Sequence, residues 1–265
     1  MRNLSYYTLS LSGGKDSLAL FLKLLEVRAK LDEVVCVDLG DEYDAIYDVL
    51  LYVASICLKE KIKFTVLTIP ETDDYRAFVK ETGKDIGMFK YLAIYHKRPN
   101  GKVGYGWCGK CRWATSIKKQ LLNNYYQSLE RFVIEAVGIA NDEYMRMDIG
   151  PYKNYAKTYP LVKWGMSEQD CLDYCYSHNV FWLENGIRLY DKLDRVSCKH
   201  CQNKNLKELR NIRKDIPDLW EDFLEWQRMI HYPYRSDGAT IFDLEERFAN
   251  EEKFKQVTIF ELLGA

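Results

Sequence analysis

The chain has 265 residues, 47% of them hydrophobic, a formal net charge of −1 and eight cysteines. This length suits one large domain or a core domain with an appendage, and the near-zero charge excludes a global polyanion-binding field. Because the sequence has no apolar run of membrane-spanning length and no signal-peptide pattern, we expect a cytoplasmic protein whose cysteines are metal ligands or buried thiols rather than disulfides.

The first part of the chain alternates apolar strands with amphipathic helices. Strands are expected at Tyr6–Leu11, Val34–Val37, Lys63–Ile69 and Phe132–Gly138. Helices are expected at Ser17–Ala29, about Ala45–Lys59 and Arg112–Gln127, with broken helices over Asp73–Tyr95 and a loop over His96–Gly106. This alternation predicts an α/β fold with a parallel sheet. The fold class that we expect is an open, mostly parallel five-stranded sheet with helices on both faces.

After about Gly150 the pattern changes to helices only. Helices are expected from Ser167 to about His178, over Leu206–Lys214 and over Pro217–Ile230. A run of large apolar residues in the last of these predicts helix–helix core: Leu219, Trp220, Phe223, Leu224 and Trp226. We therefore expect an α/β domain over residues 1–150 and a helical C-terminal region over residues 151–265.

The junction between the first strand and the first helix carries the sequence Ser12-Gly13-Gly14-Lys15-Asp16-Ser17. A strand–glycine turn–helix junction directs backbone N–H groups and the positive end of a helix at one point, which favours phosphate binding. The alternative is a tight turn that needs glycine only for its geometry. The segment is not a Walker A loop, because Asp16 follows Lys15 where Ser or Thr is required.

This segment resembles the SGGxDS fingerprint of the PP-loop ATP pyrophosphatase superfamily, which implies a PP-loop (HUP-like) fold and adenine nucleotide binding. We expect Ser12, Ser17 and the amides of Gly13 to Asp16 to hold the terminal phosphates. Lys15 would stabilise the charge that develops as pyrophosphate leaves. Asp16 would cap the following helix or hold Mg²⁺.

Two further strand ends carry polar residues. Asp38 ends the second strand, where it is expected to contact the nucleotide or its metal. Gly138-Ile139-Ala140-Asn141-Asp142-Glu143, with Arg146 following, is similar to a segment of the phosphoadenosine phosphosulfate (PAPS) reductase-like family. Arg146 suits phosphate or sulfate, and Asp142 and Glu143 suit orienting it or binding a metal; a surface helix start explains these acids as well.

Two C-x-x-C pairs are present, and their members are Cys108, Cys111, Cys198 and Cys201. Each pair supplies two tetrahedral positions, so together they predict one four-cysteine site for zinc or a [4Fe–4S] cluster. Two unrelated pairs of buried thiols are the alternative. Cys171 and Cys175 lie one helical turn apart and favour a buried face instead.

Between Asp85 and Glu130 the sequence has no acidic residue. The basic residues of this block are Lys90, Lys97, Arg98, Lys102, Lys110, Arg112, Lys118 and Lys119. The block predicts a local anion surface that could bind nucleic acid; the alternatives are a solvated face or a loop that contacts only the nucleotide.

Taken together, these motifs resemble the PAPS reductase-like branch of PP-loop proteins. The expected function is cleavage of ATP or a related adenine nucleotide at its α-phosphate, with release of pyrophosphate and adenylation of an acceptor for sulfur or nitrogen transfer. One alternative is a sulfonucleotide (PAPS/APS) reductase or sulfotransfer protein with a non-standard thiol, because no cysteine follows Cys201. A non-catalytic nucleotide- or nucleic-acid-binding module is the alternative from another class.

Overall fold

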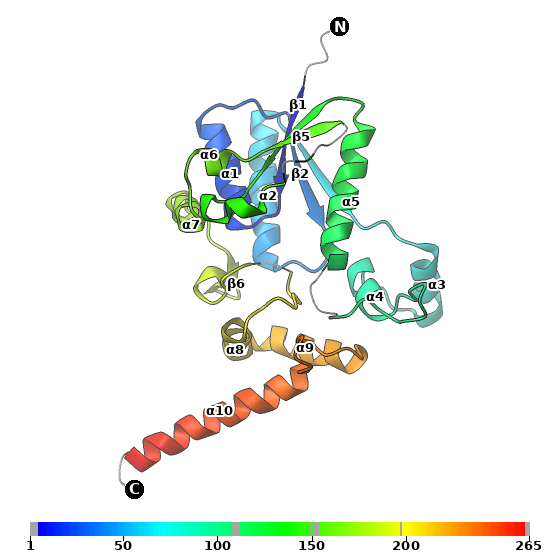
Figure 1. The fold of residues 1–265 in the computed structure, drawn as a ribbon, viewed down its shortest axis with the longest axis vertical. Coiled ribbons are helices and arrows are strands. Elements are labelled where there is room, and N and C mark those ends of the chain that lie inside the picture. Colours follow the sequence, from blue (N-terminus) through cyan, green and yellow to red (C-terminus); the bar gives the residue numbers. More distant parts are fainter. Residues whose placement is uncertain (1–4, 108–111, 149, 151–153, 197, 263–265) are drawn as a thin grey trace. The chain divides into compact units, whose positions relative to one another are not determined.

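The computed structural model describes residues 5–107, 112–148, 150, 154–196 and 198–262. Within them, one sheet has the strand order β3-β2-β1-β4-β5, and every neighbouring pair is parallel. Its strands are β1 (Tyr6–Leu11), β2 (Glu33–Asp38), β3 (Lys63–Thr68), β4 (Val133–Val137) and β5 (Tyr155–Thr158). The predicted α/β class and the open, parallel five-stranded sheet are confirmed (Figure 1).

Helices cover both faces of this sheet, as predicted (Figure 1). The crossovers through α1 (Lys15–Glu26) and α2 (Asp44–Glu60) run in the same direction along the sheet, so right-handed connections place both helices on one face. The chain returns across the sheet through α5 (Arg112–Ser128), which packs Tyr126 against Val35 and Val133. The carboxyl ends of β1 and β4 therefore adjoin at one edge.

The fifth strand lies where the sequence predicts helices only, and that prediction is wrong. β5 spans four residues at the sheet edge, and Tyr155 alone among them is buried. A run this short leaves no period-2 pattern that distinguishes it from loop. The hairpin of β6 (Leu183–Glu184) and β7 (Ile187–Arg188) was not predicted either, because its strands are even shorter than β5.

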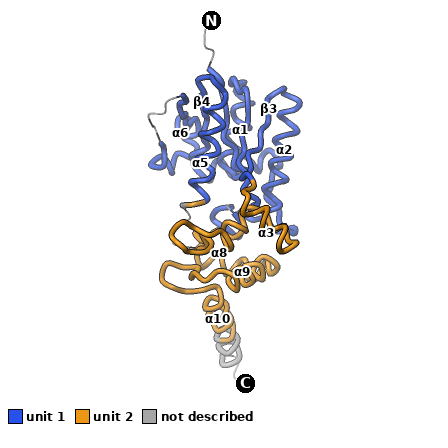
Figure 2. Tube along the Cα trace, turned by 90° about the vertical axis from the view of Figure 1, so that its right-hand side faces the viewer, with its two compact units in different colours: residues 1–70, 114–198 blue, residues 71–113, 199–265 orange. Residues whose placement is uncertain are grey.

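The chain forms two compact units, which Figure 2 colours separately. Unit 1 comprises residues 1–70 and 114–198, and unit 2 comprises residues 71–113 and 199–265. This division differs from the expected boundary at residue 150. The physical reason is that β5 completes the sheet of unit 1 and α7 (Glu168–Ser177) packs on α1, so residues after 150 belong to its core.

Unit 2 has a core of aromatic rings contributed by both of its segments. Its helices are α3 (Asp73–Thr82), α4 (Met88–Ile94), α8 (Leu206–Asp215), α9 (Pro217–Met229) and α10 (Ile241–Leu262). Trp107 stacks on Trp226 at 6.2 Å, and Phe223 is fully buried beside it. The predicted core role is confirmed for four residues of α9, namely Leu219, Trp220, Phe223 and Trp226, whereas Leu224 is half-buried.

The remaining described elements of unit 1 are short. They are the 3₁₀ helices η1 (Asn141–Arg146) and η2 (Leu189–Asp191) and the helix α6 (Pro160–Lys163). Among the described residues, no helix has both the length and the apolar character that crossing a membrane requires.

Candidate functional site

The predicted phosphate turn joins β1 to α1. Gly13 has φ of +76°, and a Cβ there would lie 2.7 Å from Ile46 Cγ2, so this position requires glycine. The hydroxyls of Ser12 and Ser17 lie 3.0 Å apart, and Ser17 Oγ donates to the carbonyl of Gly14. Since the first N–H groups of a helix lack intrahelical acceptors, the start of α1 presents donors and the positive end of its dipole.

Gly138, at the end of β4, passes against this turn. A Cβ at Gly138 would lie 2.8 Å from both the nitrogen and the Cα of Ser17, closer than real Cβ contacts. Glycine is thus what lets the end of β4 approach the start of α1. The polar residues that follow β4 are brought to the phosphate turn as a consequence.

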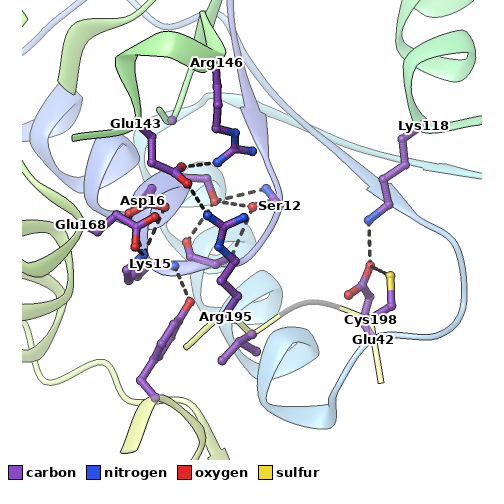
Figure 3. Close-up of a pocket in the computed structure, with 15 residues that line it drawn as sticks. Ser12, Lys15, Asp16, Glu42, Lys118, Glu143, Arg146, Glu168, Arg195 and Cys198 are labelled. Carbon is purple, nitrogen blue, oxygen red and sulfur yellow. Dashed lines mark hydrogen bonds and ion pairs between the residues drawn. The ribbon is translucent and has the colours of Figure 1, made fainter. Parts of the chain in front are cut away.

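A pocket of about 310 Å³ opens at this turn (Figure 3). Its lining comprises Ser12, Gly14, Lys15, Asp16, Ser17, Glu42, Lys118, Gly138, Glu143, Arg146, Glu168, Tyr190, Arg195, Val196 and Cys198. Every one of these residues belongs to unit 1. The sequence motifs after β1 and after β4 are thereby joined in one cavity.

Three carboxylates converge on one side of this pocket. Asp16, Glu143 and Glu168 each place an oxygen within 4.8 Å of the others, a spacing suited to a shared cation. Lys15 is 7% exposed, and its ammonium lies 3.3 Å from the carboxylates of both Asp16 and Glu168. Lys15 therefore offsets part of the negative charge of this acidic cluster.

The carboxyl of Asp16 is largely buried, with its side chain 20% exposed. Burial raises its pKa above the ordinary value, and the Lys15 ammonium acts in the opposite direction. Its Oδ1 atom is buried and has an ion-pair contact with Lys15 but no hydrogen bond among the described residues. Capping of α1 is not its role, because Gly14 is the N-cap residue.

Two arginines enter the pocket from different segments. Arg146 and Arg195 both pair with Glu143, one with each of its carboxylate oxygens (Figure 3). Both arginine side chains are more than half exposed, so they remain accessible to an anion in the pocket. Guanidinium groups bind phosphate and sulfate through two parallel N–H donors.

The opposite side of the pocket holds an ion pair and a thiol. Lys118 Nζ lies 2.9 Å from Glu42 Oε1, and Cys198 Sγ lies 4.0 Å from the same oxygen (Figure 3). Burial lowers the pKa of Lys118, but Glu42 and other neighbouring acidic groups more than offset this, so its pKa is raised. Lys118 thus lines the pocket, although the sequence placed it in the basic block.

Among the described residues that were predicted for the site, four do not line the pocket: Gly13, Asp38, Asp142 and Cys201. The Asp38 carboxylate accepts from the N–H of Gly40 at 2.7 Å and from the hydroxyl of Tyr47 at 3.1 Å. The Asp142 carboxylate accepts from the N–H of Glu168 at 3.0 Å. Asp142 therefore positions the first residue of α7, and with it the Glu168 carboxylate.

Sequence reasoning missed several residues of the pocket. Tyr190, Arg195 and Glu42 carry no motif, and each reaches the phosphate turn only through the fold. Tyr190 accepts from the N–H of Lys15 at 2.9 Å, and the Trp182 indole donates to the Gly13 carbonyl at 2.7 Å. The capping box at Ser167 indicates the start of α7, whose first residue is Glu168. This motif was the sequence signal that could have pointed to Glu168.

The cysteines that stand out in the sequence are the pair Cys171 and Cys175 and the four predicted metal ligands. Cys171 and Cys175 are fully buried, as predicted, and Cys175 Sγ donates to the carbonyl of Lys15 at 3.4 Å. Burial raises the pKa of Cys171 to about 12, so this thiol stays protonated. Cys108 and Cys111 lie outside the described residues, so the four-cysteine centre stays a sequence prediction.

No family model matches the chain. The curated relative is an uncharacterised protein, MJ0066 of Methanocaldococcus jannaschii, 25% identical over 231 residues. This match covers 83% of the chain and 40% of that protein, so the chain spans about two fifths of its relative's length.

Among the solved structures that are similar to this chain are two with low TM-scores. One is the U34-tRNA thiolase NcsA from Methanococcus maripaludis with its [4Fe-4S] cluster, with 17% identity, coverage of 86% of this chain and 73% of that chain, and a TM-score of 0.44. The other is an NH3-dependent NAD synthetase from Campylobacter jejuni, with 16% identity, coverage of 92% and 84%, and a TM-score of 0.33.

Proposed function

We propose that this protein is a PP-loop enzyme that binds ATP or a related adenine nucleotide and cleaves it at the α-phosphate, releasing pyrophosphate and adenylating an acceptor. The observation that carries the proposal is the meeting of a complete SGGxDS turn with Arg146, Arg195 and three carboxylates in one pocket. The finer assignment to the PAPS reductase-like family rests on the sequence around Gly138.

Binding would begin with the phosphates at the turn. The amides at the start of α1, together with Ser12 and Ser17, supply neutral donors, and Lys15 supplies a charge beside them. Arg146 and Arg195 would leave Glu143 in part to hold the oxygens that gain charge as pyrophosphate departs. Positioning and charge stabilisation then account for most of the rate.

The residues present fit a divalent cation. Asp16, Glu143 and Glu168 offer hard oxygen ligands at suitable mutual distances, which match the preference of Mg²⁺ for carboxylates and phosphate oxygens. A bound Mg²⁺ would screen the negative charge of the phosphates. Lys15 would then be free to contact phosphate oxygens rather than Asp16 and Glu168.

Cys198 favours a second candidate, a sulfonucleotide reductase, because its thiol lines the same pocket. Attack of this thiolate on the sulfur of PAPS would form an S–S bond and release the nucleotide. A dithiol reductant would then reduce that bond and free sulfite. This candidate is incompatible with Cys198 serving as a permanent metal ligand.

Product analysis separates these functions. The protein is incubated with ATP or PAPS in the presence of Mg²⁺, and with a dithiol for PAPS. AMP and pyrophosphate support the adenylating enzyme, sulfite supports the reductase, and tight binding without turnover supports a binding module. A protein that neither binds nor converts either nucleotide would overturn the proposal.

A further inference from the structure

A second surface, on unit 2, is built from the segment between α4 and α5. Lys97 and Val103 form an antiparallel bridge, and the N–H groups of Arg98 and Gly104 donate to the carbonyls of Lys102 and His96, both at 2.8 Å. Residues 96–104 thus form a hairpin. We call this hairpin, with the rings stacked beside it, the basic-aromatic hairpin.

The hairpin is held firmly on the end of α4. Tyr105 and Gly106 donate their N–H groups to the carbonyls of Leu92 and Ala93 at 2.9 and 2.8 Å. Gly104 has φ of +64°, and a Cβ there would lie 2.3 Å from the carbonyl oxygen of Ala93. A side chain at this position is therefore excluded, and the hairpin is held against the helix by its own backbone.

The hairpin is positively charged and contains no acidic residue. Lys97 and Lys102 are exposed, and the sequence from residue 86 to residue 129 contains no Asp or Glu. Arg98 lies 5.6 Å from the ring centres of both Tyr105 and Tyr232 and donates to the Tyr232 hydroxyl at 2.7 Å. This arginine holds the aromatic rings, while the two lysines face solvent.

Aromatic rings continue from the hairpin in a stack. His96 stacks on Tyr105 at 5.4 Å and 18°, and Tyr105 stacks on Trp113 at 5.2 Å and 13°. Trp113 in turn stacks on the buried ring of Phe89. His96, Tyr105 and Trp113 are all half-buried, so the stack ends at the surface beside the exposed lysines.

We propose that the basic-aromatic hairpin binds single-stranded nucleic acid. Ammonium groups contact phosphates, and partly exposed aromatic faces stack with unpaired bases, so lysines beside a ring stack match both parts of such a strand. An acidic protein or an anionic membrane would use the lysines but not the end of the ring stack. This proposal concerns unit 2 and does not depend on the nucleotide pocket.

The test uses the full-length protein and fluorescein-labelled 20-mers of oligo(U), oligo(dT) and a DNA duplex, measured by anisotropy between 25 and 300 mM salt. We expect single strands to bind more tightly than the duplex. The double variant Lys97→Glu/Lys102→Glu should lose about tenfold in affinity at low salt, and its log–log salt slope should fall by about 1.4. The RNA and DNA arms identify which strand is preferred.

The matched control is Lys59→Glu/Lys163→Glu, which changes the charge equally at exposed positions of α2 and α6. This control should keep its affinity within about twofold. His96→Ala should weaken binding about fivefold or more while leaving the salt slope unchanged, because it removes stacking and no charge. Thermal melting verifies that each variant is folded.

Three results with the oligonucleotides would overturn the proposal, and a fourth would come from lipid vesicles. The first three are the absence of salt-dependent binding to either single strand, equal losses in the hairpin and control variants, and equal affinity for duplex and single strands. Tighter binding to phosphatidylglycerol vesicles than to either oligonucleotide would assign the surface to a membrane instead. ATP affinity, measured on the same hairpin variant, should be unchanged, so failure here is distinct from failure of the nucleotide proposal.

Discussion

The phenolic oxygen of Tyr190 accepts a hydrogen bond from the backbone N–H of Lys15 at 2.9 Å, although the two residues are 175 positions apart. This N–H belongs to the phosphate turn, whose amides are expected to hold an anion. The hydroxyl of Tyr190 therefore occupies a donor that a phosphate oxygen would otherwise use. In the same segment Trp182 holds the turn through the Gly13 carbonyl.

Tyr190→Phe is expected to raise the affinity for pyrophosphate about fivefold, because the hydroxyl no longer competes for the Lys15 N–H. The free protein should at the same time lose about 1 kcal/mol of stability, the typical net value of one hydrogen bond. Isothermal titration and urea unfolding measure the two effects. A lower affinity would mean that the hydroxyl contacts the ligand instead of competing with it.

Gly14→Val is expected to abolish ATP binding while the protein stays folded. Gly14 has φ of −78°, which any residue adopts, and a Cβ there makes only ordinary contacts, with the nearest atom at 3.5 Å. The branched methyl groups of valine would fill the mouth of the phosphate turn. Titration with ATP measures binding, and circular dichroism measures folding.

Gly13→Ala is the matched comparison. Its positive φ and the 2.7 Å approach to Ile46 predict a loss of about 1–3 kcal/mol of stability rather than a specific loss of binding. Unchanged ATP affinity in Gly14→Val would exclude the phosphate turn as the nucleotide site.

Glu168→Gln is expected to weaken Mn²⁺ binding, measured by electron paramagnetic resonance, about tenfold or more. The substitution removes one of the three carboxylates that converge with Asp16 and Glu143. Glu60→Gln, at the exposed end of α2, provides the control. Equal Mn²⁺ affinities in both variants and in the original protein would remove the acidic cluster as a cation site.

Glu135→Gln is expected to stabilise the protein increasingly as the pH rises. Glu135 is 4% exposed, and burial raises its pKa above the ordinary 4.5. As the pH passes 4.5 the unfolded chain loses this proton before the folded protein does, so native stability falls until the raised folded-state pKa is passed.

Glutamine keeps an oxygen for the donors Ser10 and Tyr126 but does not ionise. Urea unfolding between pH 4 and 7.5 should give a stability difference from the original protein that grows above pH 4.5 and levels off once the folded-state pKa of Glu135 is passed. Glu130→Gln, which is exposed, should show no such trend. A constant difference for Glu135→Gln would contradict the assignment.

The four cysteines of the two C-x-x-C pairs are expected to hold one metal centre. Single Ser substitutions at Cys108, Cys111, Cys198 or Cys201 should each remove metal and lower thermal stability by similar, non-additive amounts. Elemental analysis identifies zinc or iron, and visible absorbance accompanies only an iron–sulfur cluster. Cys171→Ser is the control that keeps its metal; loss from the two pairs independently would refute a shared centre.

The sequence by itself determined the local features of this protein. The four longer strands, most of the helices and the turn from Ser12 to Ser17 were predicted because each has a contiguous periodic pattern or motif, whereas α6 and the C-terminal helix α10 were not predicted. Gly138 was also identified from sequence, since it lies within a motif after β4. Why glycine is required there could be seen only in the structure, in which a Cβ at position 138 would lie 2.8 Å from the backbone of Ser17.

Tertiary structure alone decided which distant residues share the pocket. Tyr190, Arg195 and Glu42 have no local pattern. Asp38 and Asp142 have suggestive positions, but their carboxylates accept hydrogen bonds from residues outside the phosphate turn instead. Strand β5 and the grouping of residues 71–113 with the C-terminal helices were hidden for the same reason. Side-chain direction and long-range pairing depend on how the helices and strands pack together, which a periodic pattern within one segment does not encode.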